Sequence, residues 1–379
     1  PTPQPAPPAT TPSASPTSFV GHAVLVSLLT LLSRVAGLLR DAVLAAALGL
    51  SVAADAFFIG LLVPNLFRRL FGEGALTAAF IPNYTDLLER DPALAKRFAT
   101  LTLTLLSVLL VGITLVAELA LWWLASTIDP EHKATLAIQY TRLMLPDMPL
   151  ICEGALIGGV LQVHKRFGPP AAAPLVLNGV IVAAVLLATG LFERNTEPAT
   201  VAIWVAVAVV IAGVLQLYWQ AAVLLKVTGL SRSFKGCWPT MRSMLIMMGP
   251  MVIGLAVFQI NALMDALIAF FFAPGPPGPD GTIDTQMSML GQTFDAPLRN
   301  GDVAALNWSQ RLYQFPLGVF GIALATAVLP TLSKHAAVQD MDGLRDSFSY
   351  ALRLVFFINS PAMFGLIALR EPIVQLLFQ

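Results

Sequence analysis

The chain has 379 residues, of which 56% are hydrophobic and only 12% are charged, and its formal net charge is zero. Soluble domains carry roughly a quarter charged residues, so this composition and a mean hydropathy of +0.76 exclude an ordinary soluble fold and indicate a membrane protein. A net charge of zero gives no electrostatic reason to expect a nucleic-acid partner.

Residues 1–18 are rich in Pro, Ala, Thr and Ser and contain no charged residue. Such a segment cannot bury enough apolar surface to fold, so we predict a disordered cytoplasmic tail. It also lacks the basic start of a signal peptide.

Apolar runs long enough to cross a bilayer follow the tail. A spanning helix needs about 20 residues, and backbone groups in lipid must be satisfied within the segment. We therefore predict an all-α polytopic membrane protein. The expected spans are 19–48, 52–87, 97–126, 133–163, 170–192, 199–226, 241–273, 302–333 and 344–369, with a tenth beginning at Glu371.

The basic residues of the loops predict the orientation, because cytoplasmic loops are enriched in Lys and Arg. With the N-terminus inside, eleven basic residues fall on the inner side: Arg90, Lys96, Arg97, Lys165, Arg166, Lys226, Arg232, Lys235, Arg242, Lys334 and Arg345. Four fall outside: Lys133, Arg194, Arg299 and Arg370. The long loop at 273–302 is then external, and it is interpreted as a mobile surface loop, with a partner-binding role as the alternative.

The first two predicted spans contain polar and charged residues in unusual number. The first span contains the string SRVAGLLRD. The second contains an aspartate near its start, Asp55, and later the string PNLFRRLFGEG. The residues concerned are Ser33, Arg34, Arg40 and Asp41 in the first span, and Asp55, Asn65, Arg68, Arg69 and Glu73 in the second. Charges inside a bilayer are costly and normally face water or one another, so we predict a polar cavity here.

Helical spacing supports a shared face for these residues. Arg34 and Asp41 are seven positions apart, which returns nearly to the same side of a helix, and Asn65, Arg69 and Glu73 follow at intervals of four. The arginines outnumber the acids, and guanidinium groups bind phosphate oxygens in pairs, so an anionic diphosphate is the expected ligand. The alternative is structural, with Arg69 and Glu73 as an intrahelical pair and Arg40 reaching the lipid headgroups.

Later spans add weaker candidates. Arg311 has no acid within one helical turn, so we expect a counter-ion from another helix or a bound anion. Asp265, with Asn261 one turn away, could bind a coupling cation or simply form a local hydrogen bond. Arg142 and Asp147 flank a proline and are interpreted as a structural pair. No function is assigned to two further acids, Glu118 and Glu153.

At the inner end of the fourth span, His164, Lys165 and Arg166 are expected to meet anionic headgroups. Cys152 and Cys237 are interpreted as plain thiols. The scattered histidines and the lack of an Asp-rich motif argue against a metal site or a polyprenyl-phosphate enzyme, although measured hydrolysis would revive the latter. No cofactor is expected.

Three strings carry a family resemblance. The stretch from SRVAGLLRD to PNLFRRLFGEGALTAAFIPNY resembles the opening signature of the MurJ (MviN) lipid II flippases. QRLYQFPLGVFGIALATAVLPTLS is similar to their eighth helix, and LPDMPLICEGALIGGVLQVHKRFGPPAAAPLVLN to their fourth and fifth. The resemblance runs from about residue 22 to the end.

The resemblance implies the fold of the multidrug/oligosaccharidyl-lipid/polysaccharide exporters, two helix bundles around a cavity working by alternating access. The first bundle is then 19–226, a basic linker 227–240, and part of the second bundle 241–379. The implied activity is movement of lipid II, an undecaprenyl-diphosphate precursor of peptidoglycan, across the bacterial inner membrane. The family's cavity residues fall on Arg34, Arg40, Arg68, Arg311 and Asp55, and Ser33, Asn65 and Glu73 also match its pattern.

Three departures from the family pattern stand out. Gln310 replaces the usual acid before the arginine of helix eight, the 273–302 loop is longer than typical, and the sequence stops as a tenth helix begins. We therefore expect a fragment or a shortened protein. Further expectations are a monomer, contacts with phospholipids and with peptidoglycan synthesis proteins, and coupling to Na⁺, H⁺ or the membrane potential.

Three alternatives to a lipid II flippase remain open. A related exporter of another lipid-linked oligosaccharide or small molecule would share the fold, although a cavity for cationic drugs should be acidic. A membrane enzyme would need a catalytic constellation. A shortened paralogue would bind lipid or a partner without transport.

Overall fold

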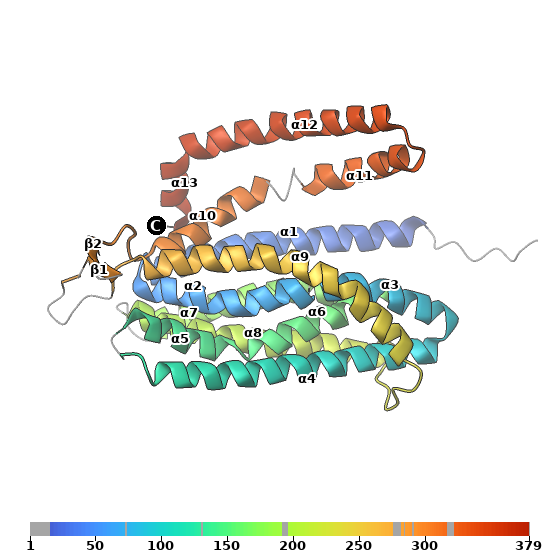
Figure 1. Cartoon of the computed structure of the whole chain (residues 1–379), viewed down its shortest axis with the longest axis horizontal. Helices are drawn as coiled ribbons and strands as arrows, with labels where there is room; N and C mark the ends of the chain where they lie inside the picture. The colour runs from blue at the N-terminus through green and yellow to red at the C-terminus, as the bar shows by residue number, and fades with distance from the viewer. Residues whose placement is uncertain are drawn as a thin grey trace, which may run out of the picture.

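The computed structural model describes residues 16–72, 74–129, 132–191, 196–275, 282–283, 285–289, 292–316 and 322–378. Within them most of the chain is helical, and the long helices run side by side along the longest dimension of the molecule (Figure 1). The elements are α1 (Pro16–Leu48), α2 (Val52–Phe67), the π-helix η1 (Arg68–Gly72), α3 (Ala75–Arg90), α4 (Pro92–Ala125), α5 (Lys133–Met144), α6 (Asp147–Val163), α7 (Gly168–Leu191), α8 (Pro198–Val227), α9 (Trp238–Phe271), β1 (Gln286–Met289), β2 (Gln292–Asp295), α10 (Asp302–Pro316), α11 (Ile322–Ala337), α12 (Met341–Ala368) and α13 (Arg370–Phe378).

Each predicted span corresponds to one helix or to successive helices, and the span 52–87 corresponds to α2, η1 and α3. The prediction of an all-α membrane protein is confirmed, with one addition. The external loop contains a two-stranded antiparallel hairpin, in which Gln286 pairs with Asp295 and Met289 with Gln292. The predicted tail lies almost entirely outside the described residues, and α1 begins at Pro16.

Polar caps mark where several helices begin. The hydroxyl of Ser51 accepts a hydrogen bond from the Ala54 amide at 3.2 Å and starts α2. Asp91 accepts from the amides of Ala93 and Leu94, each at 3.0 Å, and starts α4. Because such caps satisfy backbone donors that have no intrahelical partner, they fix these helix starts.

Prolines coincide with the breaks inside two predicted spans. Pro64 precedes the π-helix that interrupts the second span, since proline cannot donate a backbone hydrogen bond. Pro146 lies between α5 and α6, which meet at an angle of 40°. The first break is followed at once by Arg68 and Arg69, and the second by Asp147.

The first eight helices pack closely around two hydrophobic cores. One core joins Phe57, Phe58 and Tyr140 to Trp308 of α10, whose ring meets Phe58 edge to face at 5.7 Å. The other gathers residues of α3, α4 and α6 with the start of α9. At Gly60 the α2 and α5 backbones approach so closely that an added Cβ would lie 2.9 Å from the Thr141 amide nitrogen.

Among the described residues, five helices are long and apolar enough to cross a membrane, namely α4, α7, α8, α9 and α12. The bent pair α5–α6 makes a sixth candidate. Trp122 and Trp123 are exposed near the end of α4, and Trp238 is exposed at the start of α9. Tryptophan favours the membrane–water interface, so these residues fit the two boundaries of a bilayer.

The later helices form a second group beside α1. Figure 1 shows α10 and α11 following one another above α1, with α12 outside them and α13 descending at one end. The hairpin lies at the same end as α13, while the α8–α9 loop and the α11–α12 turn lie at the opposite end. The loops predicted to be external and cytoplasmic therefore separate to opposite ends.

Candidate functional site

A cavity of about 610 Å³ lies among α1, α2, η1, α6, α7, α8, α9 and α10. Its charged lining consists of five arginines and three aspartates: Arg34, Arg40, Arg68, Arg69, Arg311, Asp41, Asp147 and Asp265. The lining therefore carries an excess of two positive charges when all are ionised. A cavity of this charge favours an anion.

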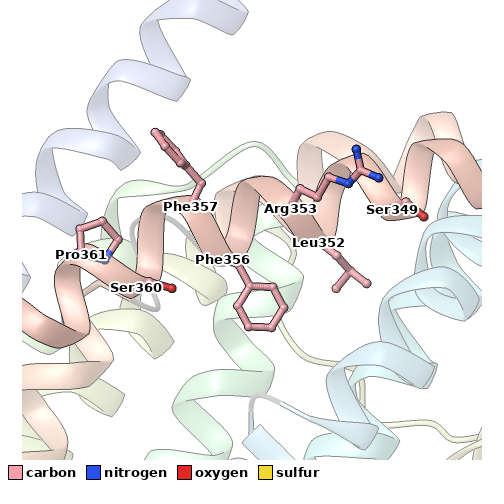
Figure 2. A pocket seen from close by; sticks show the side chains of 7 residues that line it. All are labelled: Ser349, Leu352, Arg353, Phe356, Phe357, Ser360 and Pro361. Atoms are coloured by element: carbon pink, nitrogen blue, oxygen red, sulfur yellow. The ribbon is translucent and has the colours of Figure 1, made fainter.

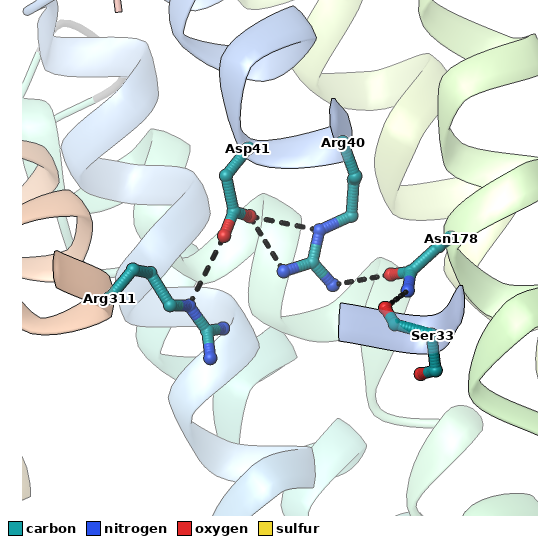
Figure 3. Close-up of polar contacts among 5 residues, drawn as sticks. All are labelled: Ser33, Arg40, Asp41, Asn178 and Arg311. Carbon is teal, nitrogen blue, oxygen red and sulfur yellow. Dashed lines mark hydrogen bonds and ion pairs between the residues drawn. The ribbon is translucent and has the colours of Figure 1, made fainter. Parts of the chain in front are cut away.

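Asp41 occupies the centre of an arginine pair (Figure 3). Its Oδ1 accepts from Nε and Nη2 of Arg40 at 2.9 and 2.6 Å, and its Oδ2 lies 3.3 Å from Nε of Arg311. The carboxylate is buried, with only 5% of the residue exposed. The counter-ion expected from another helix for Arg311 is thus Asp41 of α1.

Asn178 of α7 orients the second side of Arg40. Its Oδ1 accepts from Nη1 of Arg40 at 3.0 Å, and its amide donates to the Ser33 carbonyl at 3.2 Å. This chain of contacts, visible in Figure 3, ties α7 to α1. Asn178 was not predicted as a site residue. Its sequence signal is a single asparagine within an apolar run, which could have indicated a polar contact inside the bundle.

Three more arginines line the cavity. Arg34 is exposed and makes no hydrogen bond or ion pair with any residue that the structure describes. Arg69 donates from Nη1 to Oε1 of Gln259 in α9 at 3.3 Å. Arg68 has its Nε buried beside the cavity. Arg34 and Arg69 therefore offer guanidinium donors that no carboxylate neutralises among the described residues.

Of the remaining predicted site residues, two line the cavity and the third, Glu73, is not described by the structure. Ser33 and Asn65 line the cavity, together with Gln310 and Gln314 of α10. Glu73 lies outside the described residues, so the predicted intrahelical pair with Arg69 stays a prediction. The assumed spacing of four is interrupted by the π-helix Arg68–Gly72.

Asp55 was expected to line the cavity, but it is not among the lining residues. It lies in the first turn of α2. Asp55 is 2% exposed, and its carboxylate accepts hydrogen bonds from the amides of Gly301 and Ala304 at 2.7 and 2.9 Å. It thereby caps the N-terminus of α10, where the helix dipole favours a negative charge. Gly301 has a φ of +95°, and a Cβ added there would lie 2.5 Å from the Cβ of Leu50, so this junction requires glycine.

Lys133 makes the complementary contact and was predicted only as an external loop residue. It is 6% exposed. Its Nζ donates to the carbonyl oxygens of Phe270 at 2.6 Å and Pro274 at 3.3 Å, and also to that of Ala273. A cation is favoured at a helix C-terminus, so α2 and α5 hold both ends of the α9–α10 connection. We call Asp55 and Lys133 the outer clamp.

The predicted pair of Arg142 with Asp147 is wrong. Nε of Arg142 instead lies 3.1 Å from Oε2 of Glu118 in α4, and Glu153 of α6 accepts a hydrogen bond from Ser107. Asp147 turns to the cavity at the first turn of α6, and is 4% exposed. Residues five positions apart point about 140° away from each other around a helix, and the chain also bends by 40° at the break beside Pro146.

Asp265 and Asn261 lie one turn apart on α9, with 3.5 Å between the Asn261 amide nitrogen and Oδ2 of Asp265. Asp265 lines the cavity, whereas Asn261 is exposed and outside the lining. Within the described part of the chain, no three His, Cys, Asp or Glu residues gather to hold a metal. A weak cation site with oxygen ligands from one acid remains a hypothesis.

At the opposite end of the first bundle, the buried Tyr84 meets the half-buried His164. The Tyr84 hydroxyl and Nε2 of His164 are 2.8 Å apart. Burial lowers the pKa of His164, so the neutral ring is favoured over the cationic headgroup-binding form. Lys165 follows with a φ of +60° at the end of α6.

A second hollow of about 750 Å³ follows one side of α12 (Figure 2). All its lining residues belong to that helix: Ser349, Leu352, Arg353, Phe356, Phe357, Ser360 and Pro361. None is a predicted site residue. The hollow is separate from the charged cavity, and its mostly apolar lining suits lipid contact.

Comparisons with known proteins agree with the geometry. The family model for the lipid II flippase MurJ matches residues 44–379. A probable lipid II flippase MurJ of Vibrio cholerae is 31% identical over 370 residues, covering 94% of this chain and 64% of the relative. The chain thus spans a little under two thirds of that relative's length.

Two solved structures show the same fold. The lipid II flippase MurJ in an inward closed conformation superposes with a TM-score of 0.70 at 23% identity, over 94% of this chain and 67% of the other. A MOP superfamily transporter from Pyrococcus furiosus gives 0.58 at 18% identity, over 94% and 73%. The fold of this chain is thus the one seen in these two structures.

Proposed function

Because the chain belongs to the lipid II flippase MurJ family, whose model matches residues 44–379, we propose that it moves lipid II between membrane leaflets by alternating access. The diphosphate headgroup enters the charged cavity from the cytoplasmic side, while the polyprenyl tail stays in lipid. The protein breaks no bond and needs no cofactor, so the activity is transport and not catalysis.

The observation that carries the proposal is the arginine excess of the cavity. Arg34 and Arg69 have no carboxylate partner among the described residues, and Arg40 and Arg311 share one acid, Asp41. Guanidinium groups bind diphosphate oxygens in bidentate geometry. Binding of a dianion would neutralise the excess of two charges in the lining.

The clamp at the outer end supports an inward-facing arrangement. Asp55 and Lys133 of the first bundle hold α10 and α9 together there. We place this end outside the inner membrane and the N-terminus in the cytoplasm, because eleven of the fifteen loop Lys and Arg residues then lie inside.

Transport in this scheme is driven by the membrane potential or by an ion gradient. Moving an anionic headgroup outward is favourable when the inside is negative. Asp265 is the proposed contact for Na⁺ or H⁺. The transport unit is a monomer surrounded by phospholipid, and the hairpin β1–β2 is the surface that proteins of peptidoglycan synthesis would meet.

A test of this proposal uses cells depleted of their own flippase and supplied with a full-length version of this protein. We expect the full-length wild type to restore growth and lipid II movement, whereas Arg34→Ala and Arg311→Ala abolish both. Normal transport by both variants would exclude the cavity as the headgroup site.

A binding assay separates the cargo classes. Purified protein is titrated with lipid II and with a cationic dye in parallel. Tight lipid II binding without dye binding supports the flippase, and the reverse result would favour an exporter of small cationic molecules.

A further inference from the structure

Asp147 is a buried acid of the cavity wall for which the proposed binding scheme has no use. It begins α6 directly after the 40° bend and is one of the residues that line the cavity. Only 4% of the residue is exposed. Its Oδ1 lies so close to Gly213 of α8 that an added Cβ would overlap the oxygen. The missing side chain at position 213 therefore makes room for the carboxyl group between the two helices.

The carboxyl group of Asp147 has no polar partner in the part of the chain that the structure describes. It forms no hydrogen bond and no ion pair there, and it does not accept from the backbone amides of its own first helical turn. An isolated carboxylate is costly to bury, and a group in such a place neutralises instead by binding a proton. The neutral acid has an O–H donor that the carboxylate lacks. Asp147 can therefore present a hydrogen-bond donor to a ligand in the cavity.

The helices packed against α6 bring no free negative charge to Asp147 among the described residues. Helix α7 contains no charged residue, and the charges of α3 and α8 lie in their last turns. Glu118 of α4 pairs with Arg142 of α5, and Glu153 of α6 itself accepts from Ser107. Asp55 of α2 is held at the start of α10.

The charges that line the cavity with Asp147 are mainly positive. Arg68 and Arg69 belong to η1, which packs against α6. The other charged lining residues belong to α1, α9 and α10, namely Arg34, Arg40, Asp41, Asp265 and Arg311. Positive charges favour an ionised carboxylate, whereas burial favours the neutral acid. An anion bound among the arginines offsets their charge, so its arrival shifts this balance toward the neutral acid.

We propose that Asp147 binds the headgroup as a neutral carboxylic acid that donates its O–H to a phosphate oxygen, so that one proton enters the cavity with each lipid. The proton comes from water when the anion binds and returns to water when the anion leaves. With Asp147 neutral, five arginines face only two ionised aspartates, and the positive excess of the lining rises from two to three. This inference rests on the proposed function, because it concerns a contact of the same headgroup in the same cavity.

The test measures the affinity of a full-length version of this protein, purified in detergent, for lipid II and for sulfate between about pH 5.5 and about pH 8.5. Sulfate is an oxyanion that does not itself titrate in this range. In the wild type the affinity for both anions should fall as the pH rises, by up to about tenfold per pH unit, because one proton binds with the anion. In Asp147→Asn the amide donates without a titrating proton. That variant should therefore lose the slope and keep the low-pH affinity, which a merely structural acid would not produce.

Matched variants attribute the slope to Asp147. Glu153→Gln removes an acid from the same helix outside the cavity lining and keeps an oxygen for Ser107, so its pH dependence should equal that of the wild type. Asp147→Ala removes the donor, so its low-pH affinity should be about ten- to a hundredfold below that of Asp147→Asn. Asp147→Ser is a second neutral donor if the asparagine variant folds poorly. Because no ion gradient is present, the assay reports Asp147 separately from cation coupling at Asp265.

The outcomes separate two failures. If the wild-type protein binds neither anion, the proposed headgroup site itself is wrong. If it binds lipid II with the same pH dependence as Asp147→Asn, or if Asp147→Ala binds as tightly as Asp147→Asn at low pH, the proton-carrying contact alone is overturned. Bound sulfate whose affinity does not change with pH, beside a slope for lipid II, would place the donor away from the phosphates and overturn that assignment.

Discussion

Nε of Arg311 in α10 lies 3.3 Å from Oδ2 of Asp41 in α1, and this pair joins helices on two sides of the cavity. The same carboxylate holds Arg40 through its other oxygen. One acid thus positions two guanidinium groups from different bundles. A headgroup that draws one arginine away would loosen the contact between the bundles.

Arg311→Gln should weaken lipid II binding by about ten- to a hundredfold, because it removes a charge-assisted contact of the kind that contributes roughly 1.5–3 kcal/mol. Titration of the purified variant with lipid II measures the loss. Arg142→Gln is the matched control, since that arginine pairs with Glu118 outside the cavity. Equal affinity of the Arg311 variant and the wild type would contradict the assignment.

Much of this arrangement follows from the sequence. Length and apolarity predict the spans, and the spacing of Arg34 and Asp41 correctly places both on the cavity face. These features depend on the local periodicity of one helix. The resemblance over 44–379 then supplies the two-bundle fold.

Contacts between segments far apart in the sequence could not be predicted from helical periodicity. Asp55 and its partner Gly301 are 246 positions apart, and Lys133 is 137 positions from Phe270. Periodicity gives the face of a helix but not what lies opposite it. The expected pair of Arg142 with Asp147 failed for a local reason, because residues five positions apart point about 140° away from each other around a helix, and α5 and α6 also meet at 40°.

Asp55→Ala should destabilise the start of α10, because the amides of Gly301 and Ala304 lose their acceptor. Loss of a cap costs about 1–2 kcal/mol, which corresponds to roughly five- to thirtyfold faster amide exchange at these residues if the end opens locally. Hydrogen–deuterium exchange measures this change. Asp302→Ala is the control, since that side chain accepts from the Arg299 amide and not from Gly301 or Ala304 among the described contacts. Equal protection in wild type and Asp55→Ala would refute the clamp.

Lys133→Met should open the outer end, because the buried carbonyls at the end of α9 lose their donor while the side-chain length is kept. Each buried unsatisfied group costs about 1–3 kcal/mol. A cysteine at Val303, which is 1% exposed, should then react faster with a membrane-impermeant maleimide applied from outside. Lys133→Arg keeps the charge and should open less.

The two native cysteines should contribute little background to this labelling experiment. Cys152 and Cys237 are both buried, and burial raises the pKa of the Cys237 thiol. Less thiolate is present at neutral pH, and the thiolate is the reactive form. Background labelling in the chain without the Val303→Cys change should therefore be slow; unchanged labelling at position 303 in Lys133→Met would show that the clamp does not close this end.

Asp265→Asn tests whether a cation couples to transport. The carboxylate lines the cavity and has one amide neighbour, Asn261, at 3.5 Å, so it has room for a further ligand. If it binds Na⁺ or H⁺, lipid II movement by the wild type should respond to replacing Na⁺ or to changing pH, and the variant should lose that response. Asn261→Ala should weaken the response less, because an amide contributes no charge. A response that persists unchanged in Asp265→Asn would assign coupling elsewhere and leave the membrane potential as the driving force.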